Sequence, residues 1–215
     1  MTRPDAARAS QTKKRTRIQT VNQEKILDGA LEVFSRYGYR GATVDQIARA
    51  CGMSKPNLLY YFRRKHDLYV AVLKRTLEMW LGPLEEMDPA GDPATELSKY
   101  IARKMEFSRT NPQESRLFAS EVLQGAPLLH AVLEGRVRDL VEKKAEVIRA
   151  WIADGKIAAV DPYHLIFMLW ATTQHYADFE SQIAAILPAQ SRQETLDAAA
   201  RTLPAILLRG VLPRR

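Results

Sequence analysis

Residues 42–65 constrain the fold more than any other part of the chain, because they carry the start and stop signals of two short helices joined by a tight turn. Thr43, followed three residues later by Gln46, forms a capping box, which predicts that a helix begins directly after Thr43. Gly52 lies at the end of this helix, where a left-handed backbone is cheap only for glycine. Ser54 suits the N-cap of a second helix. The segment therefore predicts a helix-turn-helix.

The second helix of such a unit enters the major groove of DNA, and the outward side chains of this one suit that task. Lys55 can donate to guanine or to a phosphate, and Asn57 can pair with the edge of an adenine. Ser54 and the helix N-terminus suit a phosphate oxygen. The alternative for each residue is a solvated surface position. We expect DNA contacts from Thr43, Met53, Ser54, Lys55, Asn57, Tyr60, Tyr61 and Lys65.

The charge of the chain is unevenly distributed, in agreement with this interpretation. Residues 1–75 hold 16 Lys and Arg against 6 Asp and Glu, a net charge of +10, whereas the remaining 140 residues hold 16 basic and 19 acidic side chains, a net charge of −3. A basic surface by itself indicates no more than solubility. Together with the helix-turn-helix, it indicates a DNA-binding head on a body that does not bind DNA.

The length of 215 residues allows a sizeable core in one or two domains. Cys51 is the only cysteine, which excludes an internal disulfide and makes a reducing cytoplasm the expected location. The N-terminal residues lack the apolar region of a signal peptide, and no stretch approaches the length of a membrane span. We therefore expect neither secretion nor membrane insertion.

Apolar residues recur at helical spacing along the rest of the chain, and no segment has the alternation typical of a strand. The pattern predicts an all-α chain, with further helices at residues 22–37, 65–87, 94–108, 114–123, 128–153, 162–186 and 191–210. Residues 1–20 are polar and basic, which predicts a flexible arm. Its role is either that of a solvated tail or that of a contact with the DNA backbone or minor groove.

A helix-turn-helix formed by the second and third helices of an all-helical chain of this length resembles the TetR family of transcriptional regulators. The residues that carry the resemblance are Phe34, Gly38, Gly41, Thr43, Ile47, Ala48, Gly52, Leu58, Tyr60, Tyr61, Phe62, Lys65 and Leu68. The resemblance implies a homodimeric repressor that binds a pseudo-palindromic DNA operator and is released by a small molecule. It divides the chain into a basic arm (1–20), a three-helix DNA-binding domain (21–68) and a helical-bundle body for ligand binding and dimerisation (69–215).

Four segments of the body, at residues 78–84, 115–118, 125–129 and 164–179, resemble the pyrimidine-responsive branch of this family. This similarity extends over nearly the whole chain. It implies that the effector is uracil or thymine and that the protein controls genes of pyrimidine catabolism. The alternative is a TetR-type repressor that responds to a different small planar or hydrophobic ligand.

Four side chains along one predicted helix form the candidate effector site. Phe167, Trp170, Gln174 and Asp178 follow a single stripe of the helix at 162–186. Aromatic residues at this spacing are ordinarily core, but the carboxamide of Gln174 needs hydrogen-bond partners if it is buried. An indole face beside a carboxamide suits a pyrimidine dione, which carries N–H and C=O groups next to each other.

Other residues are expected to complete this site. Trp80 would cover the opposite face of the ring, and Phe118 lies in one of the resembling segments. Arg116 would donate to a ring carbonyl, with an internal salt bridge as its alternative. His175 and Tyr176 point to another side of their helix, where a subunit interface is the expected neighbour.

The apolar residues of the last two long helices exceed what one face of each helix should bury within one chain. They predict a two-fold dimer interface made as a four-helix bundle. The residues concerned are Leu165, Ile166, Met168, Leu169, Leu196, Leu203, Ile206 and Leu207.

Catalytic and metal-binding patterns are absent from the sequence. The four histidines show no paired ligand spacing, the single cysteine has no partner, and no nucleophile motif occurs. We therefore expect a regulator without cofactor or metal ion rather than an enzyme. The rival interpretations are an enzyme with a vestigial helix-turn-helix and an architectural DNA-binding protein without a ligand.

Overall fold

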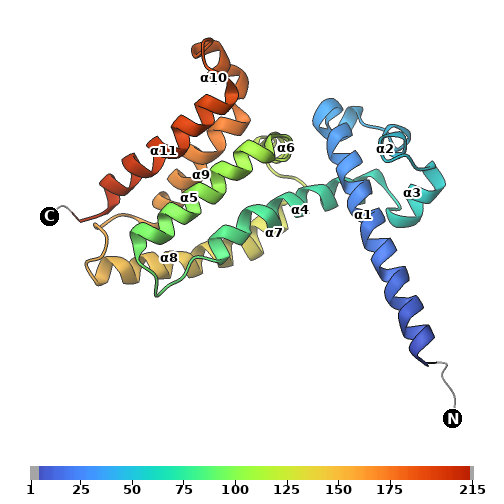
Figure 1. The fold of residues 1–215 in the computed structure, drawn as a ribbon, viewed down its shortest axis with the longest axis horizontal. Coiled ribbons are helices and arrows are strands. Elements are labelled where there is room, and N and C mark those ends of the chain that lie inside the picture. The colour runs from blue at the N-terminus through green and yellow to red at the C-terminus, as the bar shows by residue number, and fades with distance from the viewer. Residues whose placement is uncertain (1–4, 214–215) are drawn as a thin grey trace. The chain divides into compact units, whose positions relative to one another are not determined.

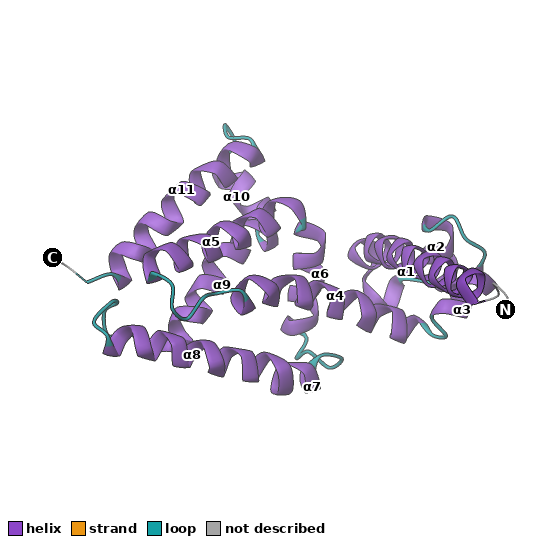
Figure 2. Ribbon diagram, turned by 60° about the horizontal axis from the view of Figure 1, so that its bottom comes forward, coloured by secondary structure: helices purple, strands orange, loops and turns teal. Residues whose placement is uncertain are grey.

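The computed structural model describes the backbone of residues 5–213 and the side chains of residues 19–213. Every regular element in this part of the chain is a helix (Figure 2). Contacts divide the chain into two compact units that meet at Lys74 and Arg75. The sequence placed the boundary after residue 68. The difference arises because helix α4 (Lys65–Glu85) continues without a break through both positions.

The first unit contains α1 (Asp5–Gly41), α2 (Val44–Ala50), α3 (Lys55–Tyr61) and the beginning of α4. Gly38 interrupts α1 with a φ of 67°, at the point where the sequence predicted the helix to end. Towards the N-terminus, α1 reaches Asp5, whereas a flexible arm was predicted over residues 1–20. No Gly or Pro occurs between residues 5 and 21, so nothing in the local sequence ends the helix earlier. Residues 1–4 lie outside the described residues.

The capping signals predicted for α2 and α3 are confirmed. The Thr43 hydroxyl accepts from the backbone N–H of Gln46 at 3.2 Å, and the Gln46 side chain accepts from the N–H of Thr43 at 2.8 Å. Gly52 has a φ of 61°. The Ser54 hydroxyl accepts from the N–H of Asn57 at 3.4 Å. The helix-turn-helix is therefore specified by short-range hydrogen bonds and one glycine.

The core of the first unit joins all four of its helices. Its fully buried side chains include Ile26, Phe34, Ile47, Leu58 and Leu68. The ring of Tyr69 on α4 packs edge-on against that of Phe34, with centroids 4.9 Å apart. The Lys65 ammonium donates to the carbonyl oxygens of Tyr39 and Ala42 at 2.8 Å each. These bonds tie the start of α4 to the end of α1.

The second unit is a bundle that contains the remainder of α4 together with α5 (Pro93–Thr110), α6 (Pro112–Leu123), α7 (His130–Val132), the π-helical turn η1 (Leu133–Val137), α8 (Arg138–Ala153), α9 (Pro162–Asp178), α10 (Glu180–Ile186) and α11 (Arg192–Val211). Helix α5 packs against both α9 and α11, and α6 lies against α9 (Figure 1). Proline at the first position of α5, α6 and α9 lacks an N–H that would have no partner there.

The helices of the second unit depart from the predicted ones in two places. The expected helix over residues 128–153 is interrupted by η1, a π-helical turn that contains Gly135. The expected helix over residues 162–186 ends at Asp178 and restarts at Glu180, because Phe179 adopts a non-helical φ of −114° and ψ of 29°. Both interruptions border the cavity described below.

The apolar residues predicted at a dimer interface are mostly buried inside the chain itself, which corrects that prediction. Leu165, Ile166, Leu169, Leu196 and Leu207 are each less than a tenth exposed. Helix α5 packs against both α9 and α11 and covers more of their surface than their own sequences suggested. Phe167, Met168 and Ile206 remain exposed, by 48%, 40% and 62%.

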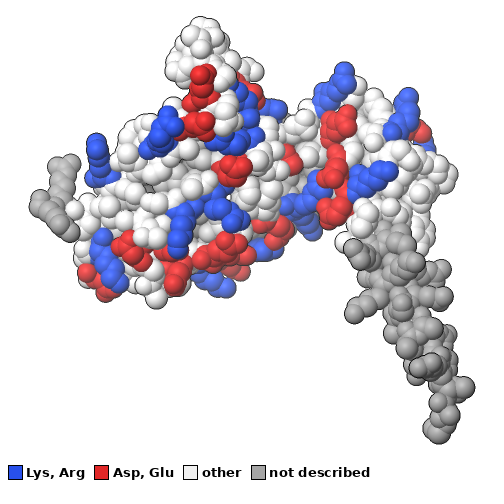
Figure 3. All heavy atoms as spheres, in the orientation of Figure 1, with Lys and Arg blue, Asp and Glu red and all other residues white. Residues whose placement is uncertain are grey.

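The surface of the second unit mixes basic and acidic side chains (Figure 3). Arg136 of η1 pairs with Glu78 and Glu85 of α4, and Arg149 of α8 pairs with Glu142 and Glu146. Exposed pairs of this kind contribute little to stability. Their mixture of charges agrees with the slightly negative net charge of residues 76–215.

Within the described residues, no helix is both long and apolar enough to cross a membrane. The same part of the chain contains no group of three His, Cys, Asp or Glu side chains placed to hold a metal ion.

Candidate functional site

Helix α3 presents a polar face to solvent while its apolar face anchors it. Leu58 is 1% exposed, whereas Lys55, Asn57 and Tyr60 are exposed, Tyr60 by 74%. Ser54 and Thr43, at the N-caps of α3 and α2, are exposed as well, and Met53 is half-buried. The outward positions predicted from the sequence therefore lie on an accessible surface, and their contacts with DNA stay a prediction.

Tyr61 and Lys65 are engaged inside the protein, which the sequence did not indicate. The half-buried Tyr61 hydroxyl accepts a hydrogen bond from the Asn22 side chain at 2.9 Å. The Lys65 ammonium, besides its two carbonyl acceptors, lies 4.7 Å from the centre of the Tyr39 ring. Both side chains therefore connect helices of the first unit, and their contacts with DNA stay a prediction.

An acidic residue that the sequence analysis missed adjoins the α3 face. Asp45 of α2 pairs with the Lys55 ammonium at 2.8 Å, and both side chains are exposed. The hydrogen bond from Lys55 lowers the pKa of the Asp45 carboxyl. No short-range spacing links residues 45 and 55, so only the packing of α2 on α3 reveals the pair.

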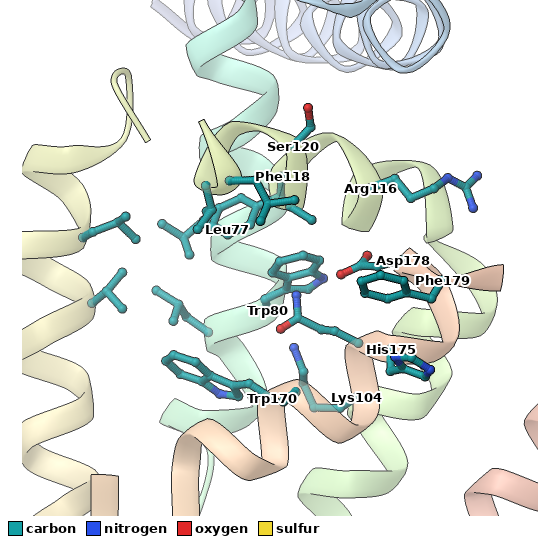
Figure 4. Close-up of a pocket in the computed structure, with 18 of the residues that line it drawn as sticks. Leu77, Trp80, Lys104, Arg116, Phe118, Ser120, Trp170, His175, Asp178 and Phe179 are labelled. Atoms are coloured by element: carbon teal, nitrogen blue, oxygen red, sulfur yellow. The ribbon is translucent and has the colours of Figure 1, made fainter. Parts of the chain in front are cut away.

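The second unit contains a partly open cavity of about 1020 Å³ lined by α4, α5, α6, η1 and α9 (Figure 4). Most of its wall is apolar, with Leu77 and Leu81 from α4 and Leu133 and Val137 from η1. The π-helical turn therefore places two side chains of one turn on the same wall. A large, mostly apolar hollow with a few polar groups is the usual form of a small-molecule site.

Six of the seven predicted effector residues line this cavity: Trp80, Arg116, Phe118, Trp170, Gln174 and Asp178. Phe167 does not, which corrects its assignment. Its side chain is 48% exposed, and its ring contacts those of His164 and Trp170 from outside, with centroids 6.3 and 5.8 Å apart. Helical spacing alone could not show where the wall of the cavity ends.

The two tryptophans are fixed by separate partners. Trp80 is 7% exposed and packs edge-on against Phe118, with ring centres 4.8 Å apart. The indole N–H of Trp170 donates to the Tyr100 hydroxyl at 2.7 Å. Burial raises the pKa of Tyr100, which keeps that hydroxyl protonated. Both indoles are thus held in place without a ligand.

Arg116 has the alternative role that the sequence left open. Its guanidinium donates to Glu180 at 3.1 Å and to the carbonyl of Ala177 at 3.3 Å, and it points away from Trp80 (Figure 4). These bonds cross the point where α9 ends and α10 begins. Arg116 therefore supports the break at Phe179 and presents little of its charge to the cavity.

Gln174 and Asp178 give the α9 wall its polar groups. The Gln174 carboxamide is half-buried and, among the described residues, makes no hydrogen bond. The Asp178 carboxylate accepts a hydrogen bond from the Ser115 hydroxyl. Burial raises the pKa of Asp178, against the opposing effect of Ser115. The cavity thus offers an unpaired amide beside a partly buried carboxyl.

Lys104 of α5 is a cavity residue that the sequence analysis missed. The side chain is 3% exposed, and its ammonium lies 4.7 Å from the centre of the Trp80 ring. Burial lowers the pKa of Lys104 to about 8, although the charge of Asp178 acts in the opposite direction. Helical spacing could have indicated this position, because Lys104 follows Leu97 by seven positions and Ile101 by three and so shares the apolar face of α5.

His175 also lines the cavity, whereas the sequence placed it towards a subunit interface. Its ring stacks on that of Phe179, with centroids 4.9 Å apart and an interplanar angle of 21°. The end of α9 at Phe179 brings the two rings together. Tyr176 is not among the residues that line the cavity.

Comparison with known proteins identifies a family match for each of the two units. Residues 26–72 match the family described as bacterial regulatory proteins, tetR family, and residues 73–214 match the YcdC-like protein, C-terminal region. The HTH-type transcriptional regulator RutR of Escherichia coli (strain K12) is 44% identical over 204 residues, which cover 94% of this chain and 96% of RutR.

More distant relatives agree. The HTH-type transcriptional repressor Rv1474c of Mycobacterium tuberculosis is 31% identical over 172 residues, 68% of this chain and 88% of that protein. The crystal structure of the regulator SCO4942 from Streptomyces coelicolor superimposes with a TM-score of 0.72 at 26% identity and covers 90% of this chain and 99% of the other. These proteins regulate transcription and are not enzymes. With its helix-turn-helix in the first unit and its cavity in the second, the chain belongs to the TetR family of DNA-binding transcriptional regulators.

Proposed function

We propose that this regulator is a homodimeric repressor whose effector is a pyrimidine dione, uracil or thymine, and that it controls genes of pyrimidine catabolism. The observation that carries the proposal is the unpaired carboxamide of Gln174 in a cavity walled by Trp80 and Trp170. A carboxamide can both accept from a ring N–H and donate to the neighbouring carbonyl. The similarity to RutR and to pyrimidine-responsive regulators supports the same effector.

The DNA-binding half of the proposal assigns the exposed face of α3 to the major groove. Lys55, Asn57 and Tyr60 lie on this face, and Thr43 and Ser54 present hydroxyls at the two N-caps. A dimer places two such faces in successive grooves about 34–36 Å apart and requires a pseudo-palindromic operator. The dimer contact is proposed on the exposed sides of α9 and α11, at Phe167, Met168 and Ile206.

Release from DNA requires that the effector favours one conformation over another, because equal affinity for both shifts nothing. Trp80 and Lys65 lie on the same continuous helix, α4. A displacement of Trp80 on ligand binding would therefore be carried along α4 to the residue that is bonded to the end of α1. This coupling is the proposed route from the cavity to the DNA-binding unit.

Gln174→Leu tests the effector site. An operator is first selected from a random DNA library with the wild-type protein, and uracil is then titrated against the complex while fluorescence anisotropy is recorded. The variant should bind the operator with wild-type affinity but fail to release it. Gln113→Leu makes the same exchange at an exposed position of α6 outside the cavity; it is the matched control and should respond as the wild type does. If the variant releases the operator at the same uracil concentration as the wild type, Gln174 is excluded from the site.

A different planar or hydrophobic effector is the second candidate, and the size of the cavity favours it. At about 1020 Å³ the cavity is at the upper end of the range of about 300–1,000 Å³ for ligand pockets, more than a single six-membered ring needs. A thermal-shift screen of pyrimidines, purines and apolar ligands separates the candidates. A ligand at 100 times its dissociation constant adds about 2.7 kcal/mol to the native state.

A further inference from the structure

One cation of the cavity wall, that of Lys104, has no hydrogen-bond acceptor among the described residues although most of its side chain is covered. Lys104 is 3% exposed, and its ammonium lies over the Trp80 ring at 4.7 Å. Among the described residues, no acceptor forms a hydrogen bond with this ammonium. Figure 4 shows the Lys104 side chain extending from α5 into the cavity, towards Trp80. Among the described residues, no side-chain nitrogen or oxygen is both fully buried and without a partner, so the Lys104 ammonium is accessible from the cavity, where a ligand can reach it.

A second buried lysine in the same unit provides an internal comparison. Lys144 of α8 is 8% exposed, and it donates to the carbonyl oxygens of Glu85 and Met87 at 2.9 and 2.8 Å. Lys144 therefore has the acceptors that a buried ammonium normally finds. Lys104 instead faces open volume, and the acceptor it lacks can be supplied by a molecule that enters the cavity.

The other charged groups of the cavity limit what that molecule can be. Asp178 is the acidic residue whose charge acts on Lys104, and it is held by the Ser115 hydroxyl. Arg116 is paired with Glu180 and directed outward. One cation and one carboxylate thus remain. These two opposite charges match a neutral ligand better than a cationic or anionic one. The ligand would carry an acceptor for Lys104 and N–H donors for Gln174 or Asp178.

We propose that Lys104 is an effector-recognition residue, whose ammonium donates a hydrogen bond to a carbonyl oxygen of the bound ring and thereby selects rings that carry oxygen at that position. The inference rests on the proposed pyrimidine effector and names the atom by which it is recognised. An ammonium can only donate, so a ring with a weaker acceptor there leaves the buried donor unpaired. Sites built around such a donor discriminate strongly against ligands that lack its partner.

The test exchanges one atom of the ligand and one side chain of the protein. Binding of uracil, 2-thiouracil and 4-thiouracil to the full-length protein is measured by calorimetry without DNA. One of the two thio compounds should bind the wild type at least tenfold more weakly than uracil. Lys104→Met should bind uracil at least tenfold more weakly than the wild type does. In this variant, the affinities for uracil and for that thio compound should differ by less than twofold. A penalty caused by the size of sulfur would instead persist in the variant.

Two further variants keep the result interpretable. Arg103→Met removes a charge from the neighbouring position of α5, outside the large cavity, and should leave all three affinities unchanged. Lys104→Gln retains a donor and should bind uracil with intermediate affinity if Lys104→Met does not fold. The melting temperature of ligand-free Lys104→Met should equal or exceed that of the wild type, since an apolar group replaces an unpaired buried charge.

The outcomes separate this inference from the function on which it rests. If the wild type binds uracil and Lys104→Met binds it equally well, the role of Lys104 is overturned while the pyrimidine effector stands. If the wild type binds none of the three compounds, the pyrimidine effector is overturned and this inference fails with it. A ligand-free Lys104→Met that melts well below the wild type would show that Lys104 is structural, and would also overturn the inference.

Discussion

The α3 face of the first unit and the cavity of the second use polar side chains in opposite ways. On the α3 face, Lys55 is exposed and already paired with Asp45, and Asn57 and Tyr60 are open to water. In the cavity, the Lys104 side chain is 3% exposed and its ammonium makes no hydrogen bond with the described residues. Bulk water surrounds the first set, whereas the second set lines a cavity in which a ligand can supply the missing acceptor.

This difference indicates how each site obtains its specificity. A solvated face binds a polyanion through many weak contacts that compete with salt, so its affinity depends on ionic strength. A buried, unpaired donor rejects any ligand that fails to satisfy it, so its selectivity depends on individual atoms.

Leu58→Ala should have the largest effect, because Leu58 is 1% exposed and anchors α3 to the core of the first unit. The free energy of unfolding of that unit should fall by about 2–5 kcal/mol, with loss of DNA binding. Urea unfolding followed by circular dichroism measures the first effect. Uracil binding to the second unit, measured by calorimetry, should persist, and its loss would contradict the separation of the two sites.

Asn57→Ala should weaken operator binding by about 1–3 kcal/mol if its carboxamide makes a bidentate contact with adenine. The loss should be confined to one base pair of each half-site, because the phosphate contacts are retained. Binding profiles over a library of single-base operator variants measure this. A profile identical to that of the wild type would remove Asn57 from base recognition.

The uracil affinity should depend on pH through Lys104, whose pKa is lowered to about 8 by burial. Between pH 7 and 9 the fraction of protonated Lys104 in the free protein falls about tenfold, and the affinity should fall with it. Asp178 and His175 also face the cavity, so the Lys104→Met variant is the control. If the uracil affinity of Lys104→Met falls as steeply with pH as that of the wild type, the pH dependence belongs to another group or to the ligand.

The same pKa shift has a consequence for the stability of the ligand-free protein. The unfolded chain holds the Lys104 proton up to about pH 10.5, whereas the folded protein releases it above about pH 8. Between these values the unfolded state binds more protons, so this group makes the free energy of unfolding rise with pH. Urea midpoints at pH 8 and 10 for the wild type and Lys104→Met measure the difference.

Asp45→Asn should have the smallest effect on stability, because both members of the Asp45–Lys55 pair are exposed. The urea midpoint should not change. Affinity for non-specific DNA should rise at low salt, since a negative charge beside the proposed DNA-binding face is removed and Lys55 is released. Unchanged non-specific binding at 50 mM salt would place Asp45 away from the DNA.

The features that the sequence determined by itself are short-range. The capping box of Thr43 and Gln46, the left-handed Gly52 and the cap at Ser54 involve residues a few positions apart, so the pattern of residue types was sufficient to locate α2 and α3. Helical periodicity likewise predicted the all-α architecture. The helix stripe and the family resemblance together named six residues that line the cavity.

Tertiary structure decided what depends on residues far apart in the chain. Helix α9 ends at Asp178 without a Pro or Gly, and Arg116 bonds to Ala177 and Glu180 across the break. Phe167 lies outside the cavity although it shares a stripe with Gln174. Lys104 lies on the apolar face of α5 but borders the cavity and the Trp80 ring instead of the core. Sequence spacing specifies which residues share a face of a helix, whereas the packing of other helices against that face decides whether they meet core, solvent or an open cavity.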